Sequence, residues 1–382
     1  MKEFFKANTI LFFVLLGNGL ATALLSVYFA SIGISLTNIG AIFSIGTMAA
    51  GFLRIPVGAF VDKYGRKSFL MIGTIGYTIF AIGLCLVISI PYFVFLNFLV
   101  ELSGAIFWTA WSAYFFDILE KNKEGEGFAT RNMVMYLAMT FSPVLAGIIA
   151  SNLGFTNLFI IAATVSLLAL FLCLTIKDHN QIKISFVKEY LDVIKIKKLR
   201  RLIILLSSLD FVFVFWSIFM PIWLKNQGVS LEAIGALLSI NLLFCALMQR
   251  PLGKAIDSYN LNKIVIPGAM LFVVGSILFF TFRNFLSYAI NRMIVGISSD
   301  MIYWPGTARV AKIAPKKEHG VIVAVVFGIS TIFRGIGSLI GGILTNYFGI
   351  DLILPSASII FFIFTILMLK QTKLFKSAKF KF

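Results

Sequence analysis

Charged residues are scarce in this chain. Only 13% of its 382 residues are Asp, Glu, Lys or Arg, about half the share usual in a soluble domain, whereas 59% are hydrophobic. A soluble protein of this length could not bury so much apolar surface in one or two cores. The composition therefore excludes a soluble globular enzyme and a disordered chain, and it leaves a polytopic helical membrane protein.

Cysteine and histidine are also rare. The three cysteines, Cys85, Cys173 and Cys245, all lie in apolar runs without paired spacing, and there are two histidines. A disulfide framework and a Cys/His metal site are therefore excluded. The chain also lacks a phosphate-binding loop, zinc-ligand spacing and a Gly-x-Ser-x-Gly elbow. We expect no catalytic residue, no cofactor and no metal, and we do not expect an ATP-driven pump.

Long apolar runs dominate what is present. Each has about 20 residues or more, which is enough to cross roughly 30 Å of hydrocarbon. Short polar or Gly/Pro-bearing breaks separate them, and one longer break, 177–201, divides the twelve runs six and six. Their approximate ranges are 7–30, 38–61, 68–89, 92–116, 129–151, 156–176, 202–224, 231–253, 264–282, 285–308, 320–346 and 351–369.

The Lys and Arg residues are distributed unevenly between the two ends of these runs. Of the 33, 27 fall on one side if both termini are cytoplasmic, and only Lys225 and Arg283 fall on the other. Because cytoplasmic loops carry an excess of Lys and Arg, we expect a multi-pass protein of the plasma membrane with both termini in the cytoplasm. The net charge of +17 thus reports membrane orientation, and no nucleic-acid partner is expected.

The two halves of the chain are repeats at a fixed offset of 195 residues. Segments 33–45 and 228–240 are identical at eight of thirteen positions. Further matches keep the same register along the halves, which indicates two homologous six-helix bundles. Because six is even, both bundles enter the membrane from the same side. The predicted units are an N-terminal bundle over 1–177, a cytoplasmic linker over 178–200, and a C-terminal bundle with a basic tail over 201–382.

A loop motif lies between the second and third apolar runs. It reads G-x-x-x-D-x-x-G-R-K, from Gly58 through Asp62, Gly65 and Arg66. This loop resembles the signature loop of the major facilitator superfamily, in its expected place, and a degraded copy lies between the eighth and ninth runs. With the twelve runs and the repeat, the resemblance covers essentially the whole chain. It implies an all-α membrane protein with twelve transmembrane helices in two pseudo-symmetric six-helix bundles.

The resemblance also implies a role for this loop. In the superfamily the loop Asp contacts the start of helix 11, and the loop Arg pairs with an acid at the end of helix 4, the position that Asp117 occupies here. A guanidinium pairs well with a carboxylate, and glycine permits a tight turn. The alternative for Asp117 is a solvated acid in a charged loop. The implied conformational latch consists of Gly58, Asp62, Gly65, Arg66 and Asp117.

The fifth run is similar to the antiporter motif of the superfamily, G-x-x-x-G-P-x-x-G-G. It keeps Pro143 and Gly147, while Ala or Ser replaces three of the glycines. This favours proton-driven export; the alternative is ordinary packing of small residues between helices. The R-x-x-x-G pattern that proton-coupled members often carry in helix 4 is missing there. It occurs instead in the tenth run, from Arg292 to Gly296.

Three acidic residues lie well inside apolar runs: Glu101, Asp210 and Asp300. Charges inside a membrane are costly, so each is a candidate for function. The resemblance places all three on helices that line a central cavity. Helical spacing puts Trp108 on the face of Glu101 and Trp304 on the face of Asp300, and an acid beside aromatic rings suits a lipophilic cation. The alternative is core packing, with the acids paired to Arg292 or Arg334.

These observations predict a secondary transporter in which two bundles rock about a site near the middle of the membrane. Protons taken up by a buried carboxylate would drive it, and Glu101 is the first choice for that group. Export of a small amphipathic compound is the first choice of activity. The alternatives are import of a nutrient or organic anion by proton symport, with Arg292 and Arg334 contacting the substrate, and a non-transporting sensor on the same fold. The expected partners are a small-molecule substrate, a proton or another coupling ion, and the lipid bilayer, and we expect a monomer.

Overall fold

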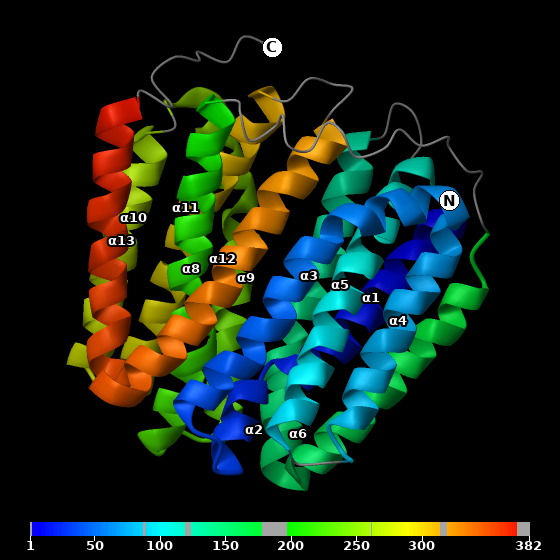
Figure 1. Cartoon of the computed structure of the whole chain (residues 1–382), viewed down its shortest axis with the longest axis horizontal. Coiled ribbons are helices and arrows are strands. Elements are labelled where there is room, and N and C mark those ends of the chain that lie inside the picture. The colour runs from blue at the N-terminus through cyan, green and yellow to red at the C-terminus, as the bar shows by residue number, and fades with distance from the viewer. Residues whose placement is uncertain are drawn as a thin grey trace.

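The protein is helical throughout the part that the computed structural model describes. That part comprises residues 2–86, 89–118, 124–177, 197–260, 262–313 and 319–372, and it contains no strand. Figure 1 shows the helices packed side by side. Their bounds are α1 Lys2–Thr22, α2 Leu25–Ser31, α3 Leu36–Tyr64, α4 Arg66–Gly83, α5 Ile90–Ile118, α6 Glu124–Leu174, α8 Lys197–Asn226, α9 Leu231–Ser258, α10 Asn262–Thr281, α11 Phe285–Ile313, α12 His319–Phe348 and α13 Ile350–Thr372.

Two of the predicted crossings differ from single helices. α1 and α2 follow each other across a break at 23–24 and make one crossing. α6 has 51 residues, but Gly154 interrupts it with a φ of 82°, a conformation that favours glycine. A straight helix of that length would measure about 76 Å, more than twice the roughly 30 Å of hydrocarbon. α6 therefore crosses twice, and the described helices make the twelve predicted crossings.

The repeat is visible in the local geometry of the helix ends. Ser35 and Ser230 cap α3 and α9 with φ/ψ of −63°/154° and −66°/156°, and each side chain accepts from the backbone N–H three residues later. Such a bond satisfies one of the free N–H groups at a helix start. The offset of 195 also relates turn glycines with positive φ, in the pairs Gly33/Gly228 and Gly154/Gly349. We refer to α1–α6 as the N-bundle and to α8–α13 as the C-bundle.

The two faces of the molecule are defined by its chain ends. Figure 1 shows that α1 begins and α13 ends at the same face, which we call the terminal face. The opposite face holds the turns at Gly33, Gly154, Gly228 and Gly349, and we call it the distal face. Of the predicted linker 178–200, residues 178–196 lie outside the described part of the chain. The helix α8 begins earlier than predicted, at Lys197.

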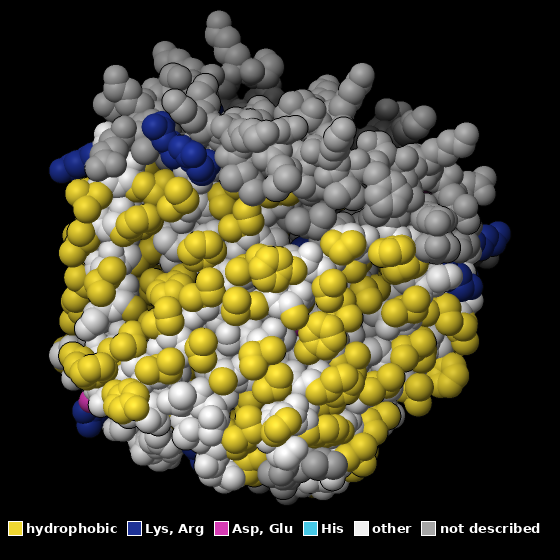
Figure 2. All heavy atoms as spheres, viewed as in Figure 1, with side chains coloured by type: hydrophobic (Ala, Val, Ile, Leu, Met, Phe, Trp, Pro, Cys, Tyr) yellow, Lys and Arg dark blue, Asp and Glu magenta, His cyan; other side chains and the backbone are white. Residues whose placement is uncertain are grey.

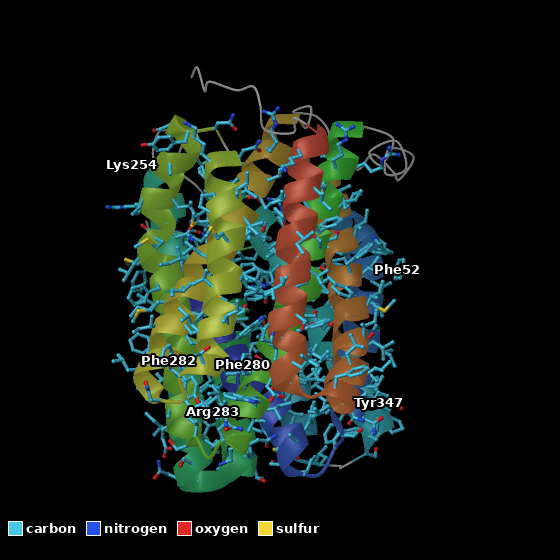
Figure 3. The ribbon with its side chains drawn as sticks, turned by 90° about the vertical axis from the view of Figure 1, so that its left-hand side faces the viewer. Phe52, Lys254, Phe280, Phe282, Arg283 and Tyr347 are labelled. Carbon is cyan, nitrogen blue, oxygen red and sulfur yellow. The ribbon has the colours of Figure 1, made fainter. Side chains whose placement is uncertain are left out.

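Apolar side chains cover the surface between these faces. Figure 2 shows hydrophobic side chains spread over the middle and lower parts of the visible face, with Lys and Arg near the margins of this region. Figure 3 places Phe282, Arg283 and Tyr347 near one end of the helices and Lys254 near the other. Exposed aromatic and basic residues at these levels are typical of the membrane–water interface. By length and composition, nine described helical segments could span a membrane, one of them the 45-residue stretch Thr130–Leu174 that crosses twice.

The two bundles meet mainly along two seams, the α3–α12 seam and the α6–α9 seam, and α2 also contacts α8. Near the distal face, Gly40 lies against Gly342 in the first seam, and Gly147 lies against Leu231 in the second. A side chain at either Gly40 or Gly147 would collide with the opposite backbone, so glycine lets the bundles approach closely there. The bundles are therefore in contact at the distal ends of both seams.

Candidate functional site

A cavity of about 360 Å³ lies between the bundles, in the size range of small-molecule sites. Its walls come from α1, α2, α3, α4 and α5 of the N-bundle and from α12 of the C-bundle. Apolar residues such as Phe43 and Val100 alternate with amides such as Asn18 and Asn97. The cavity can thus accommodate a molecule with both polar and apolar parts.

Glu101 is the acid that faces this cavity. It lies about 16 Å along α5 from the distal end of that helix, near the middle of the membrane. Thr47 of α3 donates its hydroxyl to Glu101 Oε1 at 3.3 Å. Across the bundle interface, Arg334 Nη2 of α12 lies 3.8 Å from Glu101 Oε2. The ion pair therefore links a helix of the N-bundle to a helix of the C-bundle.

Arg334 interacts electrostatically with two acids. The charges of both Glu101 and Asp210 act on it, and Asp210 is also within hydrogen-bonding reach of Ser330. Ser330 in turn lies 3.4 Å from Ser207, hydroxyl to hydroxyl. A second arginine, Arg54 of α3, lines the cavity beside them. We call Arg54, Glu101, Asp210 and Arg334 the charge cluster.

The charge cluster is formally neutral, with two acids and two arginines. Each bundle contributes one of each sign: Glu101 and Arg54 from the N-bundle, Asp210 and Arg334 from the C-bundle. Arg54, Glu101 and Arg334 line the cavity, and charges inside a membrane protein typically pair with one another or face such a cavity. The side chains of Arg334 and Glu101 remain 41% and 29% accessible. The side chains of Glu101 and Arg334 are therefore accessible from the cavity that they line.

The predicted Trp108 and a second tryptophan of α5, Trp111, differ in environment. Trp108 lines the cavity, and the guanidinium of Arg131 from α6 lies 5.8 Å from the centre of its ring. Trp111 is fully buried and stacks on Phe107 at 6.1 Å. Trp108 is thus the α5 aromatic available to the cavity, and it already faces a cation of the protein.

Asp300 lies apart from the charge cluster. Gln249 Nε2 of α9 donates to its Oδ2 at 2.9 Å. Among the residues that the structure describes, no Lys or Arg forms an ion pair with Asp300. Gln249 and Trp304 line a separate pocket of about 380 Å³ between α9 and α11. The structure therefore divides the three predicted acids into a cluster with Glu101 and Asp210 and a second environment with Asp300.

Arg292 occupies a third environment, inside the C-bundle. Its side chain is 4% exposed, and its guanidinium lies 5.6 Å from the centre of the Trp216 ring. Its Nε donates to Asn291 at 3.4 Å, while its Nη2 has no hydrogen-bond partner. A cation over an aromatic face is stabilised electrostatically. Arg292 does not line the central cavity and does not pair with Asp300.

The signature loop brings two of its predicted residues together. Arg66, at the start of α4, forms an ion pair with Asp117 near the end of α5. Arg66 Nη1 also donates to the carbonyl of Ala113 at 3.0 Å. Gly65 connects α3 to α4 with a φ of 94°, which is why glycine suits that position. The environments of the predicted Gly58 and Asp62 lie outside the described residues.

The antiporter-like motif lies in the α6–α9 seam. Pro143 and Gly147 of α6 pack against Gly235 and Leu231 of α9. Small residues at these positions let the two bundles touch. These contacts place the motif at the interface between the two bundles.

Several residues of the site were not predicted. Thr47 and Ser330 supply hydroxyls to the two acids, and nothing in their sequence context distinguishes them from other small polar residues in helices. Arg54 could have been identified, because an arginine inside an apolar run is a functional candidate in itself. In the described part of the chain no group of three or more His, Cys, Asp and Glu residues could hold a metal ion.

The fold and cavity define a class of protein, a polytopic helical membrane protein with two bundles around a charged central cavity. The model of the Major Facilitator Superfamily matches residues 8–233 and 202–379. The chain therefore belongs to the Major Facilitator Superfamily, and it is a transporter-family membrane protein rather than a member of an enzyme family.

Relatives and solved structures agree with this assignment. An uncharacterised MFS-type transporter of Methanocaldococcus jannaschii is 24% identical over 343 residues, 87% of each chain. The multi-drug resistance efflux pump PmrA homolog of Lactococcus lactis subsp. lactis is 22% identical over 350 residues, 88% of this chain and 86% of the relative. The nucleoside transporter NupG has a similar structure, with a TM-score of 0.78 at 16% identity over 99% of this chain and 100% of the other. A bacterial homolog of the human lysosomal transporter Spinster gives 0.79 at 13% identity, covering 97% and 96%.

Proposed function

We propose that this protein is a proton-coupled antiporter that exports a small amphipathic compound. The observation that carries the proposal is the ion pair between Glu101 and Arg334, at 3.8 Å, which joins the two bundles at the cavity. A group that binds a proton at the contact between two moving parts can couple the proton to their motion. The name of the PmrA homolog as a multi-drug efflux pump supports the export direction.

In this mechanism Glu101 carries the coupled proton. Deprotonated Glu101 attracts Arg334 across the bundle interface and accepts from Thr47. A proton on Glu101 removes its negative charge, so Arg334 retains only Asp210 as an acidic neighbour. The attraction between the bundles then falls, and the bundles can rearrange. A substrate with a cationic group in the same cavity competes with the proton, because either of them neutralises the charge of Glu101 that attracts Arg334.

We also propose that the protein is a monomer in the plasma membrane. Its terminal face would then lie on the cytoplasmic side. Support comes from the 27 Lys and Arg residues assigned to that side in the full sequence, since positive residues are retained there. The distal face is then external.

The orientation can be tested with single cysteines. Ser35→Cys at the distal face and Lys379→Cys in the terminal tail are made in a background without the three native cysteines. An impermeant thiol reagent applied to intact cells is expected to label Ser35→Cys and to leave Lys379→Cys unmodified until the cells are opened. Labelling of Lys379→Cys in intact cells would contradict the orientation.

The latch pair can be tested with Asp117→Asn. We expect transport to fall severalfold, because Arg66 loses its carboxylate partner near the terminal face. The loss in stability should be about 1–3 kcal/mol, because the Arg66 side chain is only 9% exposed and loses this carboxylate, while the Asp117 side chain is partly exposed. Turnover in proteoliposomes and melting in detergent are compared with Asp257→Asn, an exposed acid at the same face. Normal turnover of Asp117→Asn would contradict the proposed role of the Arg66–Asp117 pair as a conformational latch.

A second candidate function is the uptake of an organic anion together with protons. It is favoured by the cavity wall itself, whose charged residues are two arginines, Arg54 and Arg334, and a single acid, Glu101. An anionic group could bind between the arginines, which offer paired donors. Arg292, the other arginine proposed from the sequence, lies outside this cavity wall.

Transport in proteoliposomes separates the two functions. Purified protein is tested with a panel that contains a lipophilic cation such as tetraphenylphosphonium, a neutral amphipathic compound and an amphipathic organic anion. The antiport proposal predicts that a proton gradient drives the compound against the direction of proton flow. Movement of the anion with the protons would instead establish the second candidate. No gradient-driven movement of any panel member would count against both.

A further inference from the structure

A second cavity, of about 450 Å³, lies between α8, α12 and α13 of the C-bundle. The three helices contact one another, and Figure 1 shows them side by side. Apart from three serines, the described residues that line this cavity are aliphatic or aromatic, and they differ from those that line the central cavity. We call the second cavity the lateral groove.

The lateral groove extends from the apolar outer surface into the interior of the C-bundle. Its rim includes Ile204 of α8 and Ile360 of α13, which are 44% and 66% exposed. Its inner wall includes Phe215 of α8 and Phe361 of α13, which are 2% and 1% exposed. A molecule in the groove would therefore touch side chains that lipid at the outer surface does not reach.

The N-bundle has large side chains at equivalent positions. The offset of 195 relates Ser208 to Phe13 and Ser356 to Ile161, and both of these apolar residues pack against the core of the protein. Among the hydrogen bonds that the structure describes, the hydroxyls of Ser208 and Ser356 donate only to carbonyls of their own helices. The two serines therefore make no described polar contact between helices, and their effect is to leave space.

Bulkier residues also separate the helices of the C-bundle at this place. In the N-bundle, a side chain at Gly17 of α1 would come within 3.0 Å of the backbone nitrogen of Ser166 of α6, so these two helices lie in direct contact. The counterparts in the C-bundle are Val212 and Phe361, and both line the lateral groove. The sequence differences between the repeats therefore open a groove in the C-bundle where α1 and α6 are closed on each other.

The lining selects an apolar chain as the occupant of the lateral groove. Water is a poor occupant, because a bound water needs several polar partners, whereas an apolar molecule supplies the van der Waals contacts that the walls would otherwise lack. From Ile353 to Phe364 the groove follows α13 for about 16 Å, similar to the roughly 15 Å of hydrocarbon that one leaflet contributes. An acyl chain of a membrane lipid has about this length and is present at the rim of the groove.

A basic residue lies at the end of the groove toward the terminal face. Arg200 of α8 is exposed, and it precedes Ile203 and Ile204 of the groove lining by three and four residues. Residues at this spacing share one face of a helix. A guanidinium binds phosphate with paired hydrogen bonds, and basic residues at a membrane surface attract anionic lipids. The position of Arg200 therefore suits the headgroup of an anionic lipid whose chain enters the groove.

We propose that the lateral groove binds one acyl chain of an anionic phospholipid from the leaflet at the terminal face, with the phosphate of the lipid at Arg200. The bound chain lies close to the charge cluster, because Ser207 of the groove is 3.4 Å from Ser330, hydroxyl to hydroxyl, and Ser330 is within hydrogen-bonding reach of Asp210. The inference goes beyond the proposed function, since it does not depend on the substrate, the coupling ion or the direction of transport.

The occupant is tested with a photoactivatable phosphatidylglycerol that carries a diazirine near the end of one acyl chain. The protein is placed in nanodiscs that contain this probe, irradiated, digested and analysed by mass spectrometry. Label on the buried Phe215 and Phe361 is compared with label on Met270 of α10, which is 57% exposed and reports ordinary contact with the bilayer. We expect label on both buried phenylalanines in the unaltered protein.

Two variants copy residues of the N-bundle into the groove, Ser208→Phe and Ser356→Ile. Each should lower the label on the two buried phenylalanines at least about fivefold relative to Met270, because a closely packed interior has no room for both the new side chain and a lipid chain. Ser217→Phe is the matched control, since Ser217 is an exposed serine of α8 outside the groove lining whose hydroxyl also donates three residues back along the helix. Ser356→Ile replaces Ser208→Phe if that variant does not fold.

The headgroup is tested with Arg200→Gln and with the corresponding phosphatidylcholine probe. Arg200→Gln should reduce groove labelling by the phosphatidylglycerol probe about fivefold, the contribution of one basic residue near an anionic surface. Lys254→Gln, which alters an exposed lysine at the same face, should leave the labelling unchanged. The phosphatidylcholine probe should label the groove of the unaltered protein several-fold less than the phosphatidylglycerol probe.

Four results would contradict the proposal. Label confined to exposed residues such as Met270 would overturn it, as would unchanged labelling of the buried phenylalanines in Ser208→Phe and Ser356→Ile. Equal labelling by the two probes, or an unchanged yield in Arg200→Gln, would overturn the assignment to an anionic headgroup. Loss of the label when a transported compound is added would assign the groove to the substrate instead. Failure of the proton-antiport function would leave these labelling results unaffected, so the two ideas are tested separately.

Discussion

Glu101→Gln is expected to abolish transport driven by a pH gradient while leaving exchange of substrate for substrate measurable. Glutamine keeps the size of the side chain and can still accept from Thr47, which lies 3.3 Å from Glu101 Oε1. It cannot carry a proton, and it removes the negative charge that faces Arg334. Gradient-driven initial rates should fall at least about tenfold, the effect of losing about 1.4 kcal/mol of coupling.

The matched control for this prediction is Asp300→Asn. Asp300 is also an acid inside a span, but it contacts Gln249 rather than an arginine. We expect the variant to retain gradient-driven transport within a few-fold of the parent. Both reactions are measured in proteoliposomes at equal protein content. Gradient-driven transport in Glu101→Gln together with its loss in Asp300→Asn would assign the proton to α11 instead.

Arg334→Met is expected to cause the largest loss of stability among the cavity variants. It leaves Glu101 and Asp210 without the guanidinium whose charge acts on both. An uncompensated buried charge costs about 3–5 kcal/mol, and a smaller loss of about 1–3 kcal/mol is expected here because the cavity admits water. The Arg334 side chain is 41% accessible, in keeping with that water access. The melting temperature in detergent should therefore fall clearly below that of the parent.

A double variant separates loss of the ion pair from loss of packing. Arg334→Met combined with Glu101→Gln removes one of the two uncompensated acids, so part of the stability should return. The coupling between the two positions should be about 0.5–3 kcal/mol. Arg250→Met is the control, because this arginine is exposed on the surface of α9. Strictly additive losses would show that Glu101 and Arg334 do not interact in the folded protein.

The fold could be predicted from the sequence because membranes impose simple local rules. The apolar runs ending near 151 and beginning near 156 correspond to the interruption of α6 at Gly154. The repeat predicted two homologous bundles, and the structure shows that Ser35 and Ser230 cap α3 and α9 in the same way. Length, hydropathy and glycine position all act within a few turns of helix, so they can be read from a single chain.

The site was less predictable because its contacts join residues that are far apart in sequence. Glu101 and Asp300 look alike in sequence, but the first meets an arginine of the other bundle and the second an amide. Arg292 has a spacing that suggests a cavity residue, whereas Trp216 holds it inside the C-bundle. The side of a helix that faces the other bundle is set by packing between residues that are a hundred or more positions apart in the sequence. The hydrophobic periodicity of a single helix does not contain this information.

The repeat contains long-range information that only the structure makes readable. Positions 54 and 249, and positions 136 and 331, were aligned by the offset of 195 from the start. Their side chains differ within each pair, so residue identity gave no signal. In the structure Arg54 donates a hydrogen bond to Thr331 across the α3–α12 seam, and Gln249 donates one to Tyr136 across the α6–α9 seam. These two bonds show that the paired positions are structurally equivalent.

The pH inside proteoliposomes during substrate efflux tests the central claim most directly. Vesicles are loaded with a transported member of the compound panel and a pH indicator, diluted into compound-free buffer of the same pH, and clamped electrically with an ionophore. Antiport predicts that the lumen becomes acidic as the compound leaves, because protons enter in exchange, and that Glu101→Gln shows efflux without this change. An alkaline shift, or efflux of the compound from wild-type vesicles with no change in pH, would contradict proton-coupled antiport through Glu101.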